Sequence, residues 1–477
     1  MKKCLFIVLL LYIIRFVSFS QVGIGTPTPH QSAAVDITST NKGALLPRMT
    51  TAQRKAIVNP AAGLLVFDLN KNSFYFFDGQ TWRPLGFIDE RSLDPISHYA
   101  SDSANGDYFG NSVSINGDYA IIGSYLDDIG SNIDQGSAYI FRRTGGAWIQ
   151  EAKLIASDGS YGDYFGFSVS ISGDYAIVGA YHDDTATRSD QGSAYIFQRS
   201  GTVWIQQVKL WANDGASGDN FGRSVAITND FAVVGSPLDG VGSNFYQGSI
   251  YIFPNQSGWG NGIKMTAPDG TSSDIFGFSV AASGINIVAG AIGDESRKGA
   301  VYVFYNDGLE DWYFMTKLTA SDGVADDEFG YSLSIDGNYI IAGAPSKDSP
   351  GILNHGAAYV FIQNNSIWTQ LQVLRAADKA AEDKFGNSVS INGDYIIVGA
   401  NEDDKYREII GISSDEGSAF LYKKNNGFWS ILRKIELNNG NFFNKFGSSV
   451  SIYGSEIIIG SPTSIFQTGS VSFLNIE

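Results

Sequence analysis

The pair Phe-Gly occurs seven times in this chain of 477 residues, at intervals of 53 to 61 residues. The seven phenylalanines are Phe109, Phe165, Phe221, Phe276, Phe329, Phe385 and Phe446. A period of about 50 residues is typical of the four-stranded blades of β-propellers. We therefore expect one all-β, seven-bladed β-propeller, in which these phenylalanines are core residues, instead of the roughly three domains that the length alone suggests.

Each repeat has the alternation of apolar and polar residues that strands require. In the first repeat, residues 112–115 and 119–123 alternate on either side of Asn116-Gly117. An Asn-Gly pair in this setting predicts a tight hairpin with positive φ at both central positions. A third strand is expected after Gly136, and a fourth contains Trp148. The sequence thus predicts four-stranded blades throughout.

The last repeat lacks a tryptophan-bearing fourth strand before the chain ends at Glu477. Residues 96–102, which precede the first Phe-Gly pair, align with residues 152–158 of the first repeat. We predict that Ile96–Tyr99 supply the missing outer strand of the last blade. Such a closure of the ring by an N-terminal strand removes the exposed edges of an open array.

The first twenty residues have the pattern of an export signal. Lys2 and Lys3 precede an apolar segment, Leu5 to Ile14, and the small residues Ser18 and Ser20 follow. This pattern predicts a cleavable signal peptide, residues 1–20, that is too short to span a bilayer. We expect a secreted or cell-surface protein with no membrane span in the mature chain.

Charge and cysteine content narrow the partners further. The net charge is −17, and it becomes −20 when Lys2, Lys3 and Arg15 leave with the signal peptide. So acidic a chain is a poor partner for nucleic acid or an anionic membrane. Cys4 is the only cysteine, so the mature protein is stabilised without disulfides.

Residues 21–92 differ from the repeats and form a separate small module. The stretches 21–26, 43–50 and 74–82 are similar to short N-terminal modules of exported bacterial surface and tail-fibre-like proteins. We expect a short helix from Thr51 to Ile57, capped by Thr50 or Thr51. The predicted domains are therefore the signal peptide, this module at 21–92, and the propeller at 93–477.

The repeats themselves resemble a known family. Phe-Gly-x-Ser-Val is followed by a hairpin and then by segments such as Ile121-Ile122-Gly123-Ser124 and Val233-Val234-Gly235-Ser236-Pro237. This combination resembles the FG-GAP repeats of the integrin α-chain propeller, over residues 93–477. The resemblance implies a seven-bladed propeller used for binding or adhesion, although fold alone does not fix function.

Integrin-type repeats often carry a calcium cage in the loop between the first and second strands. Here that place holds two-residue turns such as Asn116-Gly117 and Asp336-Gly337, which leave no room for the six to eight oxygen ligands that calcium takes. The integrin-type cage is absent, and no cofactor is certain.

The loop Asp-Gly-x-x-x-Asp-x-Phe-Gly offers another place for calcium. Its aspartates either accept backbone N–H bonds in a tight turn or chelate calcium at the modest affinity of extracellular modules. The metal candidates are Asp158, Asp163, Asp214, Asp219, Asp322 and Asp327. Both interpretations remain open at this point.

The loops between the second and third strands open on the same face of a propeller as those entering the first strand. Their acids are the candidates for ligand contact: Asp127, Asp128, Asp183, Asp184, Glu402, Asp403 and Asp404. We expect a non-enzymatic propeller that recognises a protein or glycan through this acidic face. One alternative is a lectin with sites between blades, and another is a hydrolase that uses acids near the central channel. The sequence has none of the common nucleophile, metalloprotease or phosphate-loop motifs.

Overall fold

The computed structural model describes residues 22–28, 33–41, 43–71, 73–77, 79, 81–84, 95–185, 187–308, 311–404, 416–437, 444–462 and 468–476. The predicted signal peptide lies outside these residues. The chain divides into two compact units, Met1–Ser92 and Leu93–Glu477. Nearly all of the regular structure is β, and eight of the sheets have four strands.

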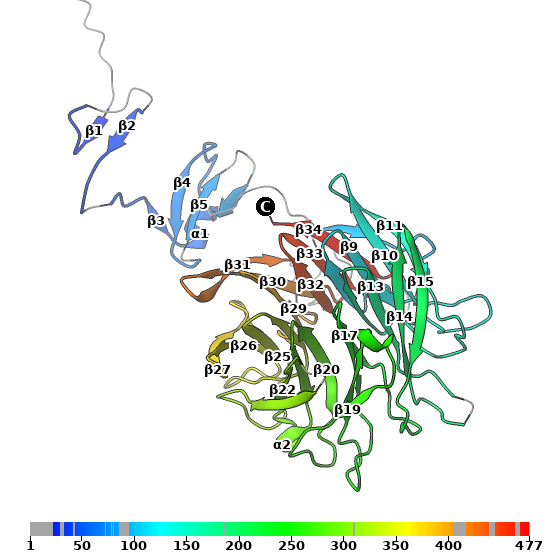
Figure 1. The fold of residues 1–477 in the computed structure, drawn as a ribbon. Helices are drawn as coiled ribbons and strands as arrows, with labels where there is room; N and C mark the ends of the chain where they lie inside the picture. Colours follow the sequence, from blue (N-terminus) through cyan, green and yellow to red (C-terminus); the bar gives the residue numbers. More distant parts are fainter. Residues whose placement is uncertain are drawn as a thin grey trace, which may run out of the picture. The chain divides into compact units, whose positions relative to one another are not determined.

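The first unit contains two small sheets and one helix (Figure 1). β1 (Val22–Ile24) pairs in parallel with β2 (Val35–Ile37). The second sheet contains β3 (Arg48–Met49), β4 (Leu65–Asp68), β5 (Ser73–Phe77) and β6 (Trp82–Pro84). Helix α1 (Thr51–Lys55) begins at the predicted cap Thr50, whose side chain accepts a hydrogen bond from the Gln53 N–H.

The second unit contains seven four-stranded sheets in a blade-like arrangement (Figure 1). The first sheet has β8 (Val113–Asn116), β9 (Tyr119–Ser124), β10 (Ser137–Thr144) and β11 (Ala147–Leu154). The second has β12 (Ser168–Ser172), β13 (Tyr175–Ala180), β14 (Ser193–Ser200) and β15 (Val203–Leu210). The third has β16 (Ser224–Ile227), β17 (Phe231–Ser236), β18 (Ser249–Pro254) and β19 (Ile263–Met265), with the 3₁₀ helix η1 (Asn255–Ser257) after β18.

The remaining sheets follow the same order. The fourth has β20 (Phe276–Ser283), β21 (Asn286–Ala291), β22 (Ala300–Asn306) and β23 (Trp312–Leu318), with α2 (Asp294–Arg297) after β21. The fifth has β24 (Leu333–Asp336), β25 (Tyr339–Ala344), β26 (Ala357–Asn364) and β27 (Ile367–Leu374). The sixth has β28 (Ser388–Asn392), β29 (Tyr395–Ala400), β30 (Ser418–Asn425) and β31 (Phe428–Ile435).

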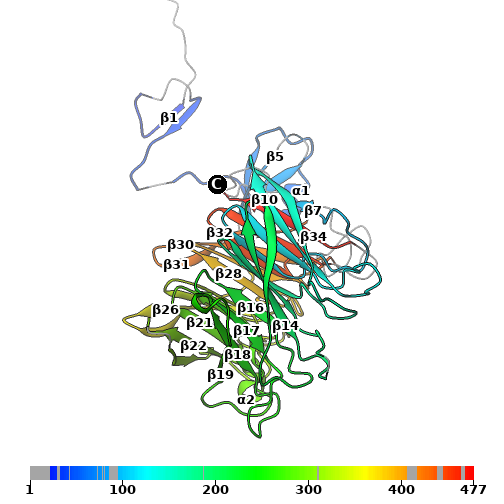
Figure 2. The ribbon, with the colours of Figure 1, turned by 45° about the vertical axis from the view of Figure 1, so that its right-hand side comes forward.

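The seventh sheet combines the two ends of the repeat region. β32 (Ser449–Tyr453), β33 (Glu456–Ser461) and β34 (Ser470–Asn475) take their fourth strand from β7 (Ile96–His98). β7 pairs antiparallel with β34, with Ile96 opposite Phe473 and His98 opposite Val471; Figure 2 shows the two strands side by side. The predicted outer strand of the last repeat is therefore confirmed.

The Phe-Gly pairs are the most buried points of the repeats. All seven phenylalanines are fully buried. Their glycines allow close backbone contact between sheets: a Cβ on Gly166, which has φ of 96°, would lie 2.1 Å from the Ser137 carbonyl oxygen. The motif thus places a large side chain in the core and a bare backbone at the junction between sheets.

The predicted geometry of the first hairpin is wrong in one respect. Asn116 is the last residue of β8 and lies opposite Tyr119, so the two central residues are Gly117 and Asp118. Only Gly117, with φ of 62°, has a positive φ, as a type II′ turn requires. The Asn116 carboxamide instead accepts a hydrogen bond from Gly173 N–H of the second sheet, at 3.2 Å.

Candidate functional site

The acids of the loop face are mostly committed to contacts inside their own sheets. In the first sheet, Lys153 Nζ lies 2.7 Å from both Asp102 and Asp127. The hydroxyl of Tyr139 donates to the same two carboxylates at 2.9 and 2.8 Å, and Ser137 also donates to Asp127. Asp127 is 5% exposed, so it belongs to the interior.

The same arrangement recurs in four other sheets. Each has a lysine of the fourth strand between an entry-loop aspartate and an aspartate that follows the second strand. The triplets are Asp158–Lys209–Asp183, Asp214–Lys264–Asp239, Asp269–Lys317–Asp294 and Asp378–Lys434–Asp403. Three of the predicted ligand-face acids, Asp127, Asp183 and Asp403, are therefore buried and bonded to lysine in this structure.

The neighbouring acids remain at the surface. Asp128, Asp184 and Asp404 are exposed. Asp128 Oδ1 accepts from the Asp134 N–H at 2.9 Å, and Asp184 Oδ1 accepts from the Asp190 N–H at 2.7 Å. These carboxylates stabilise their loops and still present charge to solvent. Residues 405–415 of the longest loop lie outside the described residues.

The second aspartate of each entry loop accepts a backbone N–H bond in a tight turn, which was one of the two interpretations of these loops. Asp163 Oδ2 accepts from the Ser160 N–H at 2.6 Å, and Asp219 Oδ2 accepts from the Ala216 N–H at 2.5 Å. Asp327 does the same with Val324 at 2.7 Å. Burial raises the pKa of Asp163 to about 7, and the nearby Asp183 carboxylate adds to this rise.

The first aspartate of each of these entry loops binds a basic side chain. Asp158, Asp214 and Asp322 bind the side chains of Lys209, Lys264 and Arg375. Burial opposes the ionisation of Asp158, yet its bonds with Lys209 and Tyr195 hold its pKa below the ordinary value. Among the described residues, no three His, Cys, Asp or Glu side chains converge as a metal site. In these loops a lysine or arginine side chain supplies positive charge beside the acids.

A tight turn surrounds every Phe-Gly pair on this face. The residue before the pair has a positive φ in all seven repeats, between 51° and 58°. In the second repeat the N–H of Phe167 donates to the carbonyl of Tyr164 at 3.2 Å and closes the turn. We call the residues directly before and after the Phe-Gly pairs the turn set: Tyr108 and Asn111, Tyr164 and Phe167, Asn220 and Arg223, Ile275 and Phe278, Glu328 and Tyr331, Lys384 and Asn387, Lys445 and Ser448.

The first two sheets contribute an aromatic cluster next to these turns. Tyr125 contacts Tyr108, Tyr164 and Phe167, with ring centroids 5.3 to 5.5 Å apart. Tyr181 continues the cluster at 4.4 Å from Phe167. All of these rings are half-buried, so each keeps part of its surface in contact with solvent.

His182 joins the same cluster. It stacks on Tyr164 at 4.6 Å and lies 4.3 Å from Tyr181. Burial lowers its pKa below the ordinary value, which favours the neutral imidazole. The histidine therefore acts as an additional aromatic surface.

Arg223 is the cationic member of the turn set in the third sheet. Its guanidinium carbon lies 4.9 Å from the Phe167 ring centroid and 4.3 Å from that of Phe278. No salt bridge involves it within the described part of the chain. Burial lowers the pKa of its guanidinium. Two aromatic faces thus hold this cation in place of a carboxylate.

The fifth to seventh sheets present charged side chains at the equivalent turns. Glu402 lies 3.0 Å from Lys384 and 3.6 Å from Lys445. Glu328 pairs with Arg297 and accepts from Ser346. Of the predicted ligand-face acids, Glu402 is therefore the one that the structure places among the turn set.

His355 contacts Ser349, as a catalytic serine–histidine pair of a hydrolase would, but at a buried position. This side chain is fully buried, and its Nε2 is bonded to Ser349. In the second sheet the corresponding pair is Thr185 and Gln191, which make the same contact at 3.4 Å. His355 therefore takes the place of a buried glutamine.

Sequence reasoning missed the turn set and the aromatic cluster. The signal was present, because the residues on either side of the constant Phe-Gly pair differ between repeats. The recurring aspartates are the more prominent pattern in the sequence. A residue that recurs at the same position in every repeat is more often part of the common fold. A residue whose identity changes between repeats at such a position does not pack in the same way in each repeat.

Comparisons with known proteins agree with this description. Six stretches match the family model described as FG-GAP repeat, and together they cover more than half of the chain: residues 99–141, 148–197, 204–253, 259–304, 312–361 and 368–422. Residues 23–101 match a model described as phage tail like trimerisation region. No curated protein matches the chain significantly. In the described part of the chain, no helix is long and apolar enough to cross a membrane.

Proposed function

Since the chain belongs to the FG-GAP repeat family, we propose that it is an exported, non-enzymatic binding protein whose loop face recognises a protein or glycan. The observation that carries this proposal is the turn set: seven identical backbone turns present seven different pairs of side chains. Binding residues are disproportionately found on loops that a rigid scaffold positions. The half-buried aromatic cluster supplies the apolar contact area that such a face needs.

The scaffold in this proposal is a closed seven-bladed ring. Its support is that the seventh sheet contacts the first as the other neighbours contact each other. Ser449 Oγ donates to the Gly110 carbonyl at 2.8 Å, as Ser388 Oγ does to Gly447 at 2.7 Å. The Ile115 N–H donates to Ser451 Oγ at 3.1 Å. Deletion of residues 93–100 should then lower the melting temperature or cause oligomerisation, and an unchanged monomer would contradict the ring.

The loop face is tested by replacing aromatic side chains without touching the core. The full chain would be screened against immobilised glycans and intact cell surfaces, beside the double variant Tyr125→Ser/Tyr181→Ser. We expect the variant to lose binding at least about tenfold, a loss of about 1.4 kcal/mol. The control is Tyr453→Ser, at the opposite end of β32 and 42% exposed. Equal loss in both variants, or none in either, would refute this placement.

The N-terminal unit has a separate role in the proposal, which is to join three copies of the chain. Its small β1–β2 sheet leaves Val22, Ile24, Val35 and Ile37 about half exposed, and such an apolar surface needs a partner. The match of residues 23–101 to a trimerisation region supports two further copies of this chain as the partner. Three propellers on one stem would bind a surface with avidity.

Sedimentation equilibrium of the mature chain tests the trimer. We expect a trimer for the wild type and a monomer for Ile24→Asp/Ile37→Asp, whereas Val203→Asp, which changes an exposed valine of the repeat region, should stay trimeric. A wild-type monomer at micromolar concentration would refute this part of the proposal. Export is tested by N-terminal sequencing of the secreted protein, which should begin at Gln21.

A further inference from the structure

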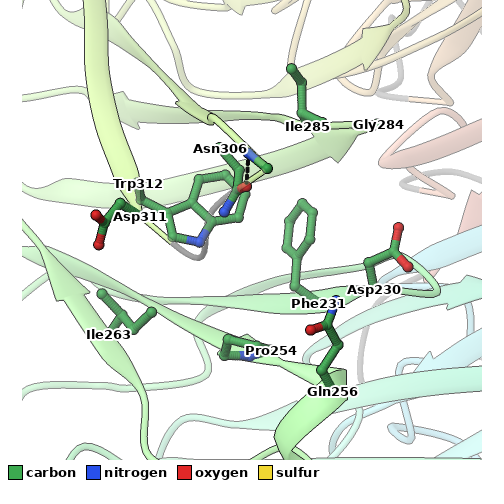
Figure 3. Close-up of a pocket in the computed structure, with 11 residues that line it drawn as sticks. Asp230, Phe231, Pro254, Gln256, Ile263, Gly284, Ile285, Asn306, Asp311 and Trp312 are labelled. Atoms are coloured by element: carbon green, nitrogen blue, oxygen red, sulfur yellow. Dashed lines mark hydrogen bonds between the residues drawn. The ribbon is translucent and has the colours of Figure 1, made fainter.

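Residues of the third and fourth sheets line an open pocket of about 880 Å³. Figure 3 shows Trp312, Asn306 and Asp311 on the side of the fourth sheet, and Phe231 and Gln256 on the side of the third. The pocket lies at the hairpin ends of the strands, away from the turn set. It is therefore independent of the loop face described above.

The pocket exists because one side chain is short. Five repeats place a residue of the third strand directly opposite the tryptophan of the fourth strand. The pairs are Arg143 and Trp148, Arg199 and Trp204, Asn306 and Trp312, Gln363 and Trp368, and Lys424 and Trp429. Four of these partners are long side chains, whereas Asn306 is too short to cover the neighbouring sheet.

The second sheet shows what a long partner does. Arg199 reaches the first sheet, where its guanidinium carbon lies 4.3 Å from the centroid of Tyr119. Tyr119 begins β9, and Phe231 begins β17 at the equivalent place. No cation covers Phe231 within the described part of the chain. The third sheet is also cut short at this end, since β19 has 3 residues where β15 has 8.

Exposure of the tryptophan follows from these two changes. Trp148, Trp204, Trp259, Trp368 and Trp429 are between 2% and 8% exposed. Trp312, the remaining member of the series, is only half-buried. Its ring makes an edge contact with Phe231, with centroids 4.8 Å apart. The half-buried Trp312 ring gives the pocket an apolar face, and the buried Phe231 ring packs behind it.

Polar groups at the rim complete the chemistry. Asn306 Oδ1 accepts from the Gly308 N–H at 2.7 Å, and its Nδ2 is a hydrogen-bond donor. Gln256 is exposed, and Asp230 and Asp311 also line the pocket. Among the described residues, no lysine, arginine or histidine lines the pocket, so these residues offer an anionic ligand no positive charge.

We propose that this pocket binds a saccharide unit without acidic groups. A sugar ring has an apolar C–H face and a rim of hydroxyls, which fit an indole face beside amide and carboxylate groups. Carboxylates accept hydrogen bonds from sugar hydroxyls, and they also tolerate the amine of an amino sugar. The pocket volume is within the range of small-molecule sites.

The test uses the full chain and an array of neutral, amino-bearing and acidic oligosaccharides. We expect at least one neutral or amino-bearing saccharide to bind and to change the tryptophan fluorescence. Asn306→Arg should recreate the Arg199 arrangement, fill the pocket and weaken binding at least about tenfold. Trp312→Ala should do the same through loss of the indole face.

The matched control is Gln363→Arg, which adds an arginine at the same register position opposite Trp368. It should bind like the wild type, and circular dichroism should show that all variants remain folded. The proposal is overturned if no uncharged or amino-bearing saccharide binds at about 10 mM, or if Asn306→Arg binds as well as the wild type. Binding of acidic saccharides or peptides alone at this pocket would also overturn it. Tyr125→Ser/Tyr181→Ser should leave this binding unchanged, which separates it from the loop-face function.

Discussion

Lys347 Nζ lies 2.8 Å from a carboxylate oxygen of Asp327, and both side chains are almost fully buried. In the first sheet the position of Lys347 is held by Asp127. The fourth-strand position of Lys153, opposite Tyr139, is held in the fifth sheet by Val373, opposite Tyr359. Compared with the first sheet, the fifth sheet thus has its lysine in the loop after the second strand, and not on the fourth strand. The buried charges stay matched although the residues have changed places.

This exchange predicts a compensating pair of substitutions. Lys347→Asp places a carboxylate beside Asp327 with no cation between them, and breaking a buried ion pair costs about 3–5 kcal/mol. Adding Val373→Lys restores the arrangement of the first sheet and should recover most of that loss. Urea denaturation of the two single variants and the double variant measures the coupling. A double variant less stable than Lys347→Asp alone would show that the two positions are not equivalent.

The lysine triplets predict stability that does not depend on calcium. Because Lys209 lies 2.7 Å from Asp158 and 2.6 Å from Asp183, a chelator should leave the melting temperature of the wild type unchanged. Lys209→Ala leaves two carboxylates without a cation, and it should cost less than the about 3–5 kcal/mol of a fully buried pair, because the Asp158 side chain is 51% exposed. Calcium added to this variant should stabilise it, with no effect on the wild type. A lower melting temperature of the wild type in EDTA would contradict the role of the lysine.

The Phe-Gly motif predicts that substituting either residue greatly lowers the free energy of unfolding. Phe165→Ala removes a fully buried ring and should cost about 3–5 kcal/mol. Gly166→Ala should prevent folding, since the new Cβ would meet the Ser137 carbonyl at 2.1 Å and the backbone has φ of 96°. The matched control is Phe245→Ala, whose ring is 76% exposed; it should change the free energy of unfolding by less than about 0.5 kcal/mol. Expression level and thermal melting measure all three.

The repeat explains why so much of the fold was predictable. The recurrence of Phe-Gly pairs every 53 to 61 residues defines the sheets. The missing fourth strand of the last repeat points to Ile96–Tyr99, most of which β7 occupies. Residues 116–118 were harder, because Asn116 is used between sheets and leaves the turn to Gly117 and Asp118. Sequence spacing cannot separate a residue that shapes its own turn from one that bonds a neighbouring sheet.

The site was less predictable, for a physical reason. Asp127 and Asp128 are adjacent acids in one loop, yet the first is buried against Lys153 and the second is exposed. Only the register between β10 and β11 shows that Lys153 lies opposite Tyr139 and reaches that loop. The pocket at Trp312 likewise depends on the length of Asn306 across the strand pair. Such contacts come from register and are not local in sequence.

The two aspartates of one entry loop should respond to pH in opposite directions. Asp163 ionises near pH 3.8 when unfolded but near pH 7 in the native state. Between these values the native state holds the extra proton, so this residue's contribution to stability falls as the pH rises. Asp163→Asn is always neutral and still accepts the Ser160 N–H, so its melting temperature should exceed that of the wild type at pH 8 and equal it near pH 4.

Asp158 has a lowered native pKa, and its contribution to stability is present above pH 3.8 and lost on acidification. Asp158→Asn should therefore melt below the wild type at pH 8, with the gap closing at low pH. A constant offset between either variant and the wild type across this pH range would show that burial and the Lys209 bonds do not set the two carboxyl groups apart.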